Sequence, residues 1–243
     1  MKNKKLYPIL NIIFFISCLY LNFKSVTGSL GGKSIRELSD KYSNLFTPSN
    51  QTFAIWSLIY LLLGLTLSIQ FSEKWKSKVM NTPFFIISCV LNGGWIVAWQ
   101  LEYISLSLMI MIGLLLTLTH INKNISDEKL RLIKLTFGIY LGWICIATIA
   151  NATALLQSCS INLSLAYQQG ITLAILLTGT SIVVGVMHKL NNPFLSLAAA
   201  WAFYGIYTRQ IENFPSIAYV SILCAILIIL VAVKLTNSLV KNQ

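Results

Sequence analysis

Charged residues are scarce in this sequence, and none lies in the middle of its long apolar segments. Only 10% of the residues are Asp, Glu, Lys or Arg, and 56% are hydrophobic, whereas a soluble domain is about one quarter charged. Ionisable side chains inside a membrane usually mark proton relays and ion-coupled pathways. Their absence argues against a carboxylate-driven pump or antiporter, and the composition predicts an integral membrane protein.

Patterns for metal binding and catalysis are also missing. The five cysteines have no CxxC spacing, so the sequence predicts neither a disulfide framework nor a metal site. It contains no phosphate-binding loop, HExxH, GxSxG or paired carboxylates on one helix face. We therefore expect no catalytic residues, no metal and no cofactor, and we expect that the protein is not an enzyme.

Long apolar runs account for most of the chain. A helix needs about 20 mainly apolar residues to cross the hydrocarbon layer. Eight segments qualify, and the links between them are short, so we predict an all-α polytopic membrane bundle. The expected spans are about 6–23, 52–71, 83–101, 104–121, 135–156, 165–187, 193–208 and 215–236.

The net charge of +11 fits the positive-inside rule better than a nucleic-acid partner. With the N-terminus inside, the inner segments hold most of the Lys and Arg residues. This predicts a multi-pass protein of the cell membrane with both termini cytoplasmic and the lipid bilayer as its partner. The first segment also reads as a secretory signal peptide, but its apolar run is long for one, and we expect it to remain as a helix. Trp75 is expected to anchor at the membrane surface.

The link 24–51 is long for this chain and contains "IRELSDKYSNLF", which predicts a short amphipathic helix lying on the surface. Pro48 should stop it, and Ser49 or Asn50 should cap the second span. A start signal for the fifth span lies at Ser126 and Lys129. Glu212 follows Arg209 by three residues, so we expect these two to form a surface ion pair.

Three spans carry aromatic and amide side chains at helical spacing, where positions three, four, seven and eleven apart share a face. An Asn amide facing lipid would be costly, so Asn92 and Asn151 should face inward with their neighbours. These stripes describe either an aromatic cavity with a few hydrogen-bonding groups or a packed seam, and periodicity alone favours the seam. The stripes are Phe53, Trp56, Tyr60 and Gly64; Asn92, Trp95 and Trp99; and Tyr140, Trp143, Ala147 and Asn151.

The same residues resemble the TspO/MBR family of tryptophan-rich sensory proteins. "FAIWSLIYLLLG" is similar to the W-x-x-x-Y-x-x-x-G of its second helix, "LNGGWIVAW" to its third and "YLGWICIATIANAT" to its fifth. The resemblance covers about residues 1–157 and implies a TspO-like five-helix domain there. Residues 158–243 would add a C-terminal extension of three transmembrane helices.

The resemblance also implies a cavity that opens toward the first link and binds porphyrins or other planar hydrophobic molecules, in a protein that can form a homodimer. Carried over by motif, the ligand-binding residues would be Phe53, Trp56, Tyr60, Asn92, Trp95, Tyr140, Trp143, Ala147 and Asn151. Trp56 and Trp143 would stack on the ligand, and Lys33, Arg36 or Lys41 would meet its carboxylates. The lead-in "FTPSNQTF" has one Pro and no Trp, unlike the family's usual loop, which leaves the ligand open.

Two functions follow. The first is a membrane sensor or carrier that binds a planar hydrophobic molecule of tetrapyrrole type between the second, third and fifth spans. The alternative is a secondary transporter of a neutral or apolar solute, with the last three spans helping to form its path.

Overall fold

Each of the eight apolar segments forms a helix in the computed structural model, which describes residues 6–72, 77–126, 130–159 and 163–241. Six stretches are long and apolar enough to cross a membrane, and α4 is a shorter apolar helix. The predicted polytopic membrane bundle is confirmed; Trp75 and Lys129 lie outside the described residues. The long helices are α1 Leu6–Val26, α3 Ile55–Ile69, α4 Phe84–Gln100, α5 Ile104–Asn124, α6 Arg131–Ser158, α7 Leu165–Lys189, α8 Leu195–Gln210 and α9 Pro215–Lys241.

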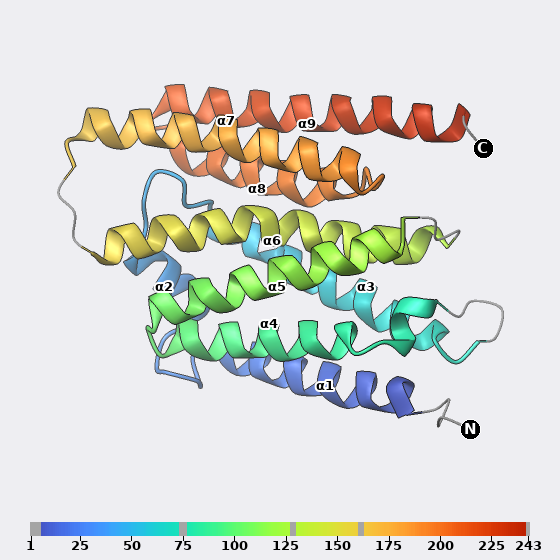
Figure 1. Cartoon of the computed structure of the whole chain (residues 1–243). Coiled ribbons are helices and arrows are strands. Elements are labelled where there is room, and N and C mark those ends of the chain that lie inside the picture. Colours follow the sequence, from blue (N-terminus) through green and yellow to red (C-terminus); the bar gives the residue numbers. More distant parts are fainter. Residues whose placement is uncertain (1–5, 73–76, 127–129, 160–162, 242–243) are drawn as a thin grey trace.

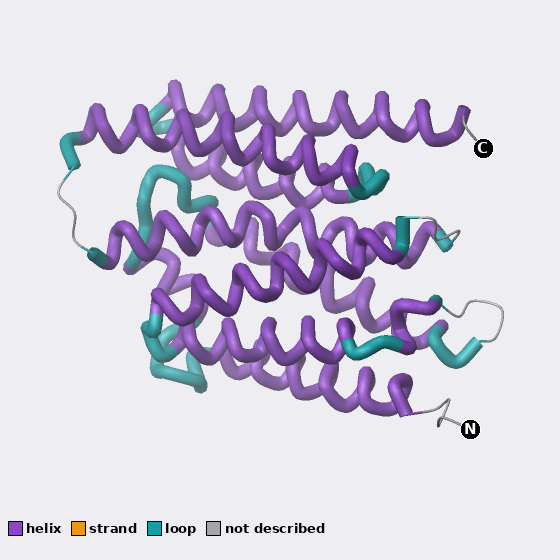
Figure 2. Tube along the Cα trace, viewed as in Figure 1, coloured by secondary structure: helices purple, strands orange, loops and turns teal. Residues whose placement is uncertain are grey.

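The helices lie side by side along one direction, with α1 at one edge and α9 at the other (Figure 1). Between them α4, α5, α6 and α8 follow in order, each packed on the next, while α3 contacts α6 and α1 behind this layer. The loops that join the helices lie toward the two ends of the bundle (Figure 2). The N- and C-terminal ends lie at the same end of the bundle, as an even number of crossings requires.

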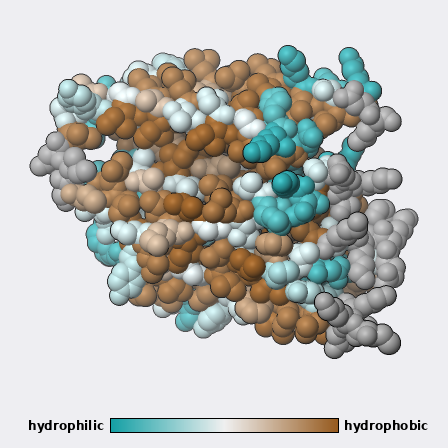
Figure 3. All heavy atoms as spheres, viewed as in Figure 1, coloured by the Kyte–Doolittle hydropathy of each residue, from teal (hydrophilic) through white to brown (hydrophobic). Residues whose placement is uncertain are grey.

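The outer surface is apolar around the bundle. Large hydrophobic side chains such as Ile13, Leu116, Leu177 and Leu230 are more than 45% exposed on four different helices. Figure 3 shows hydrophobic residues covering the middle of one face and hydrophilic residues gathered toward the end that holds the termini. An apolar belt between polar ends is the surface expected of a chain whose solvent is lipid.

A short amphipathic helix forms in the link after α1, as predicted, but it ends at Lys41 and not at Pro48. α2 Ile35–Lys41 begins with a capping box in which Ser34 Oγ accepts from Glu37 N and the Glu37 carboxylate accepts from Ser34 N. Its Ile35 and Leu38 side chains are buried against the bundle. The 3₁₀ helix η1 Asn50–Ala54 then leads into α3, but the Ser49 side chain makes no capping bond to a backbone N–H, contrary to the expected cap.

Helices α7 to α9 pack tightly on the rest of the bundle. The start of α8 lies against α6 at Gly142, where an added Cβ would stand 2.9 Å from the carbonyl carbon of Leu195. Further along, α8 lies against η1 at Gly205, where an added Cβ would stand 2.9 Å from Thr52 Cβ. Glycines at these two positions therefore let α8 approach α6 and η1 closely.

Candidate functional site

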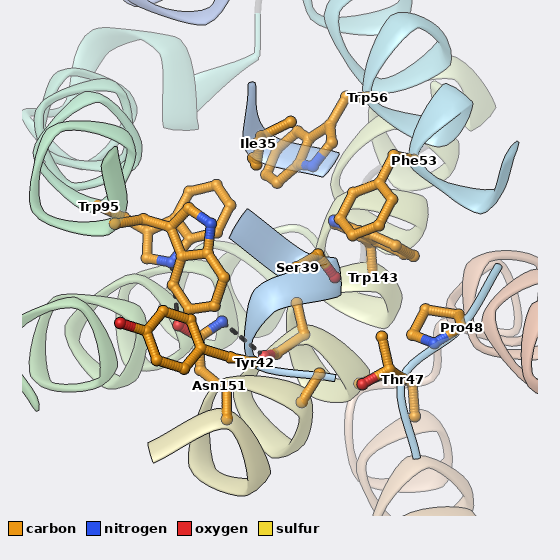
Figure 4. Close-up of a pocket in the computed structure, with 15 residues that line it drawn as sticks. Ile35, Ser39, Tyr42, Thr47, Pro48, Phe53, Trp56, Trp95, Trp143 and Asn151 are labelled. Carbon is orange, nitrogen blue, oxygen red and sulfur yellow. Dashed lines mark hydrogen bonds between the residues drawn. The ribbon is translucent and has the colours of Figure 1, made fainter. Parts of the chain in front are cut away.

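An aromatic cavity lies at the end of the bundle covered by α2. We call residues 35–54, from α2 through η1, the cover segment. It supplies part of the wall, and α3, α4 and α6 supply the rest (Figure 4). The aromatic cavity is lined by Ile35, Ser39, Tyr42, Thr47, Pro48, Phe53, Trp56, Trp95, Trp99, Trp143, Ile146, Ala147, Ala150, Asn151 and Ala154.

Trp56 is the centre of the aromatic cluster. Its indole stacks on Trp95, with ring centroids 5.7 Å apart, and on Tyr60 at 5.6 Å. Trp143 meets it edge to face at 6.1 Å, and Phe53 in turn meets Trp143 edge to face at 6.2 Å. Both arrangements are the favoured geometries for aromatic pairs, so the three predicted stripes meet in one cluster.

The aromatic rings fill most of the space between the helices. The cavity that remains has a volume of about 50 Å³, which is room for a few water molecules. The structure thus combines the two alternatives left open by periodicity, since a packed aromatic seam borders a small cavity. A planar macrocycle needs more room than this cavity offers.

The predicted site residues divide into two sets. Phe53, Trp56, Trp95, Trp143, Ala147 and Asn151 line the cavity, but Tyr60, Asn92 and Tyr140 do not. These three lie about one helical turn from the cavity residues, Tyr60 after Trp56, Asn92 before Trp95 and Tyr140 before Trp143, and they bond to one another. Tyr60 Oη donates to Asn92 Oδ1 over 3.0 Å, and Asn92 Nδ2 donates to Tyr140 Oη over 2.9 Å.

This buried triad lies behind Trp56, whose ring contacts both Tyr60 and Tyr140. Asn92 Oδ1 also accepts from Cys18 Sγ of α1 at 3.1 Å, so four helices meet at one amide that is wholly buried. Buried polar groups that are fully paired inside the protein mainly fix its packing. Gly64, the last residue of its stripe, faces Phe15 of α1 rather than the cavity.

Three indole N–H groups in the cavity wall have no hydrogen-bond partner among the residues that the structure describes. They belong to Trp56, Trp99 and Trp143, which are each no more than 5% exposed. A buried donor without an acceptor costs about 1–3 kcal/mol, and such groups are rare in folded proteins. In Figure 4 the Trp56 and Trp143 side chains lie on the same side of the cavity, beside Phe53.

Trp95 differs from these three because its indole is paired. Its Nε1 donates to Asn151 Oδ1 over 3.2 Å, and the same oxygen accepts from Ser107 Oγ at 3.2 Å. Asn151 Nδ2 donates to Ala147 O one turn earlier in α6. Asn151 therefore ties α4, α5 and α6 together at the rim of the cavity.

Glu102, in the tight turn between α4 and α5, holds the cover segment. Its carboxylate pairs with Lys33 at 3.4 Å, accepts from Tyr42 Oη at 2.6 Å and pairs with Lys41. These contacts lower the pKa of Glu102 from 4.5 to about 2, chiefly through the hydrogen bond from Lys41. The same bond raises the pKa of Lys41. Two of the three cations expected to meet a ligand are thus engaged by Glu102.

A second ion pair joins the cover segment to α8, and it differs from the predicted one. Arg209 pairs with Asp40 of α2 at 2.9 Å rather than with Glu212. The expected Arg209–Glu212 pair rested on helical spacing, but α8 ends at Gln210, so Glu212 lies beyond the turn where that spacing applies. The long-range pair joins residues 169 positions apart.

Sequence reasoning missed most of the cover side of the cavity. Thr47 and Pro48 lie beyond the predicted amphipathic helix, and Tyr42 lies in it, but that helix was expected on the surface and not in the wall of a cavity. Trp99 was in a predicted stripe, but no motif of the resemblance carried it over. Among the described residues, no three His, Cys, Asp or Glu side chains gather as a metal site.

Comparison with known proteins identifies the family to which the chain belongs. Curated proteins and solved structures give no match. A family model described as TSPO-like protein matches residues 8–234, which includes both the first five long helices and the last three. On this match the chain belongs to the TSPO-like protein family, whose members are in general membrane ligand-binding or sensor proteins.

Proposed function

We propose that the protein binds a planar hydrophobic small molecule of tetrapyrrole type in the aromatic cavity, without a chemical step. The observation that carries the proposal is the set of three indole N–H groups, on Trp56, Trp99 and Trp143, that line one cavity and find no acceptor among the described residues. A ligand with hydrogen-bond acceptors would satisfy them, and the indole faces would stack on its plane.

Phe53, Trp56, Trp95 and Trp143 would provide the apolar contacts. Asn151 and Ala147 would border the ligand at the rim. Tyr60, Asn92 and Tyr140, which the sequence assigned to the ligand, would instead support the inner side of the site, since their hydroxyl and amide groups already bond to one another.

Binding would require the cover segment to move. The closed cavity is far smaller than the 300–1,000 Å³ typical of ligand sites, and α2 with Tyr42 lies over it (Figure 4). Opening breaks the contacts of Glu102 with Lys33 and Lys41, and these two lysines then become free to meet acidic groups of the ligand. Arg36, exposed on α2, is available even in the closed form.

A fluorescence titration tests this proposal. The protein in lipid nanodiscs is titrated with protoporphyrin, and quenching of tryptophan emission is followed in the wild type and in Trp143→Ala. Tyr219→Ala serves as the control, because Tyr219 is an aromatic residue 58% exposed on α9 and away from the cavity lining. The wild type and the control should show saturable quenching, and Trp143→Ala should bind at least tenfold more weakly.

Two outcomes contradict the proposal. If no quenching saturates in either the wild type or Trp143→Ala, the tetrapyrrole ligand is wrong. If quenching saturates equally in all three proteins, the porphyrin binds elsewhere, on the lipid-facing surface.

A further inference from the structure

The cover segment makes most of its long-range hydrogen bonds with helix α8 of the C-terminal extension. Between α2 and α3 the cover segment contains only the short helix η1, so its backbone groups need partners from elsewhere. Ser49 N donates to Gly205 O over 2.9 Å. Trp201 Nε1 donates to Thr52 O over 2.9 Å, and Gln210 Nε2 donates to Leu45 O over 3.0 Å.

Arg209 joins this set at its centre. Its guanidinium pairs with Asp40 of α2 at 2.9 Å and also donates to Pro48 O over 3.3 Å. Asp40 accepts in addition from Asn50 Nδ2 at 2.8 Å. One arginine thus fixes α2, the proline that lines the cavity and, through Asp40, the start of η1.

Close approach of the two backbones supports the same contact. At Gly205 a Cβ would collide with the Thr52 side chain, and Thr52 is buried next to Phe53 of the cavity wall. Thr208 Oγ1 also donates to Ser49 Oγ over 3.0 Å. The contacts come from Trp201, Gly205, Thr208 and Arg209, which follow one side of α8 at helical spacing, and from Gln210 at the end of the helix.

We infer that α8 supports the ligand site from outside and that Arg209 is its positioning residue, holding the cover segment closed over the aromatic cavity. The inference rests on the proposed function and assigns a role to the C-terminal extension. Arg209 itself does not line the cavity, so it acts through Asp40 and Pro48. Release of Arg209 should let α2 leave the cavity more often and should speed ligand exit.

The test measures opening directly, without a ligand. Ser39 lines the cavity on α2 and is 9% exposed, so Ser39→Cys is a close steric replacement that reports opening through its rate of maleimide labelling. The background is Cys159→Ser, because Cys159 is exposed and the other four cysteines are buried. Arg209→Ala should speed labelling about tenfold, the factor expected for one lost charge-assisted hydrogen bond.

Two control variants separate positioning from general stability. Arg209→Lys keeps the charge near Asp40 and should restore most of the slow labelling. Glu212→Ala removes the carboxylate nearest in sequence to Arg209 and should change nothing. Circular dichroism at the labelling temperature shows whether each protein is folded. Unchanged labelling in folded Arg209→Ala, or equal acceleration in Glu212→Ala, would overturn the inference.

Ligand exit gives the second readout. After protoporphyrin loading, dilution into empty vesicles should release the porphyrin about tenfold faster from Arg209→Ala than from the wild type. Equal release rates would overturn the inference for ligand retention. If protoporphyrin binds neither protein, the proposed ligand fails, while the labelling rates still decide whether Arg209 positions the cover segment.

Discussion

The indole rings of Trp56 and Trp95 stack between α3 and α4, with centroids 5.7 Å apart and an interplanar angle of 26°. The two rings share one environment but differ in hydrogen bonding. Trp95 Nε1 donates to Asn151, whereas Trp56 Nε1 has no acceptor. The pair therefore separates the contribution of an indole to binding from its contribution to folding.

Replacing Trp56 with Phe should weaken protoporphyrin binding about three- to tenfold, because a ligand acceptor would lose one donor, with only a small fall in thermal stability. Trp95→Phe is the matched change, since it removes the same ring volume and an N–H that is already used by Asn151. It should lower the free energy of unfolding by about 1 kcal/mol more than Trp56→Phe. Titration and thermal unfolding in the same detergent measure both effects, and a larger stability loss in Trp56→Phe would contradict this assignment.

Asn92→Leu should destabilise the protein by about 1–3 kcal/mol, because the Tyr60 and Tyr140 hydroxyls would both lose their buried partner. The affinity of the folded protein for protoporphyrin should stay within about twofold, since Asn92 does not line the cavity. Ser88→Ala is the control, as Ser88 is equally buried on α4 but bonds only to Phe85 O of its own helix. A large loss of affinity with unchanged stability would mean that Asn92 contacts the ligand directly.

The sequence predicted which helix faces turn inward. Asn92 and Asn151 had to avoid lipid, and the aromatic residues at helical spacing from them followed, so Trp56, Trp95 and Trp143 do meet in one cluster. Periodicity fixes a face but not a depth against the neighbouring helix. The side chains one turn away from Trp56 and Trp143, Tyr60 and Tyr140, therefore bond to Asn92 instead of lining the cavity.

The cover segment could not be predicted in the same way. Its position depends on contacts with residues far away in sequence, such as Glu102 for Tyr42 and Arg209 for Asp40. Glu102 also adopts a positive φ of 61°, a conformation uncommon for a residue other than glycine. The turn sequence "QLEY" contains no glycine and therefore did not predict this conformation. Local charge spacing pointed Arg209 to Glu212, and tertiary contact with α2 overrode it.

The Glu102 contacts should make opening of the cover segment depend on pH only in acid. The pKa of this carboxyl is about 2 in the closed form against an ordinary 4.5, so its stabilisation of the closed form is complete above pH 4.5 and is lost as the pH falls toward 2. A nitroxide on Arg36→Cys, exposed on α2, reports mobility by electron paramagnetic resonance in the Cys159→Ser background.

The label should be slow between pH 8 and about pH 5 and should gain mobility below about pH 4. Glu102→Gln should be mobile at all these pH values, because the amide cannot replace the charge that faces Lys33 and Lys41. A wild-type label whose mobility changes around neutral pH, or a Glu102→Gln protein identical to the wild type, would show that Glu102 does not hold the cover segment.

Gly142→Ala should test whether residues 158–243 fold apart from residues 1–157. A Cβ at this position would stand 2.9–3.0 Å from backbone atoms of Leu195, which cannot rotate aside as a side chain can, so α6 and α8 must separate. We expect a loss of about 1–3 kcal/mol in the free energy of unfolding. Gly170→Ala is the matched control, because it is also a helical glycine and an added Cβ there meets nothing within 4 Å.

The same pair of variants tests whether the effect of Gly142→Ala reaches the cover segment. If α8 supports the cover segment, Gly142→Ala should also speed labelling of Ser39→Cys, whereas Gly170→Ala should leave it unchanged and slightly raise stability, as glycine costs about 1 kcal/mol relative to alanine within a helix. Two separate unfolding transitions in the wild type, with only the second moved by Gly142→Ala, would instead mean that the last three helices fold as an independent domain. A single transition that moves as a whole would mean that the last three helices and the aromatic cavity belong to one cooperative unit.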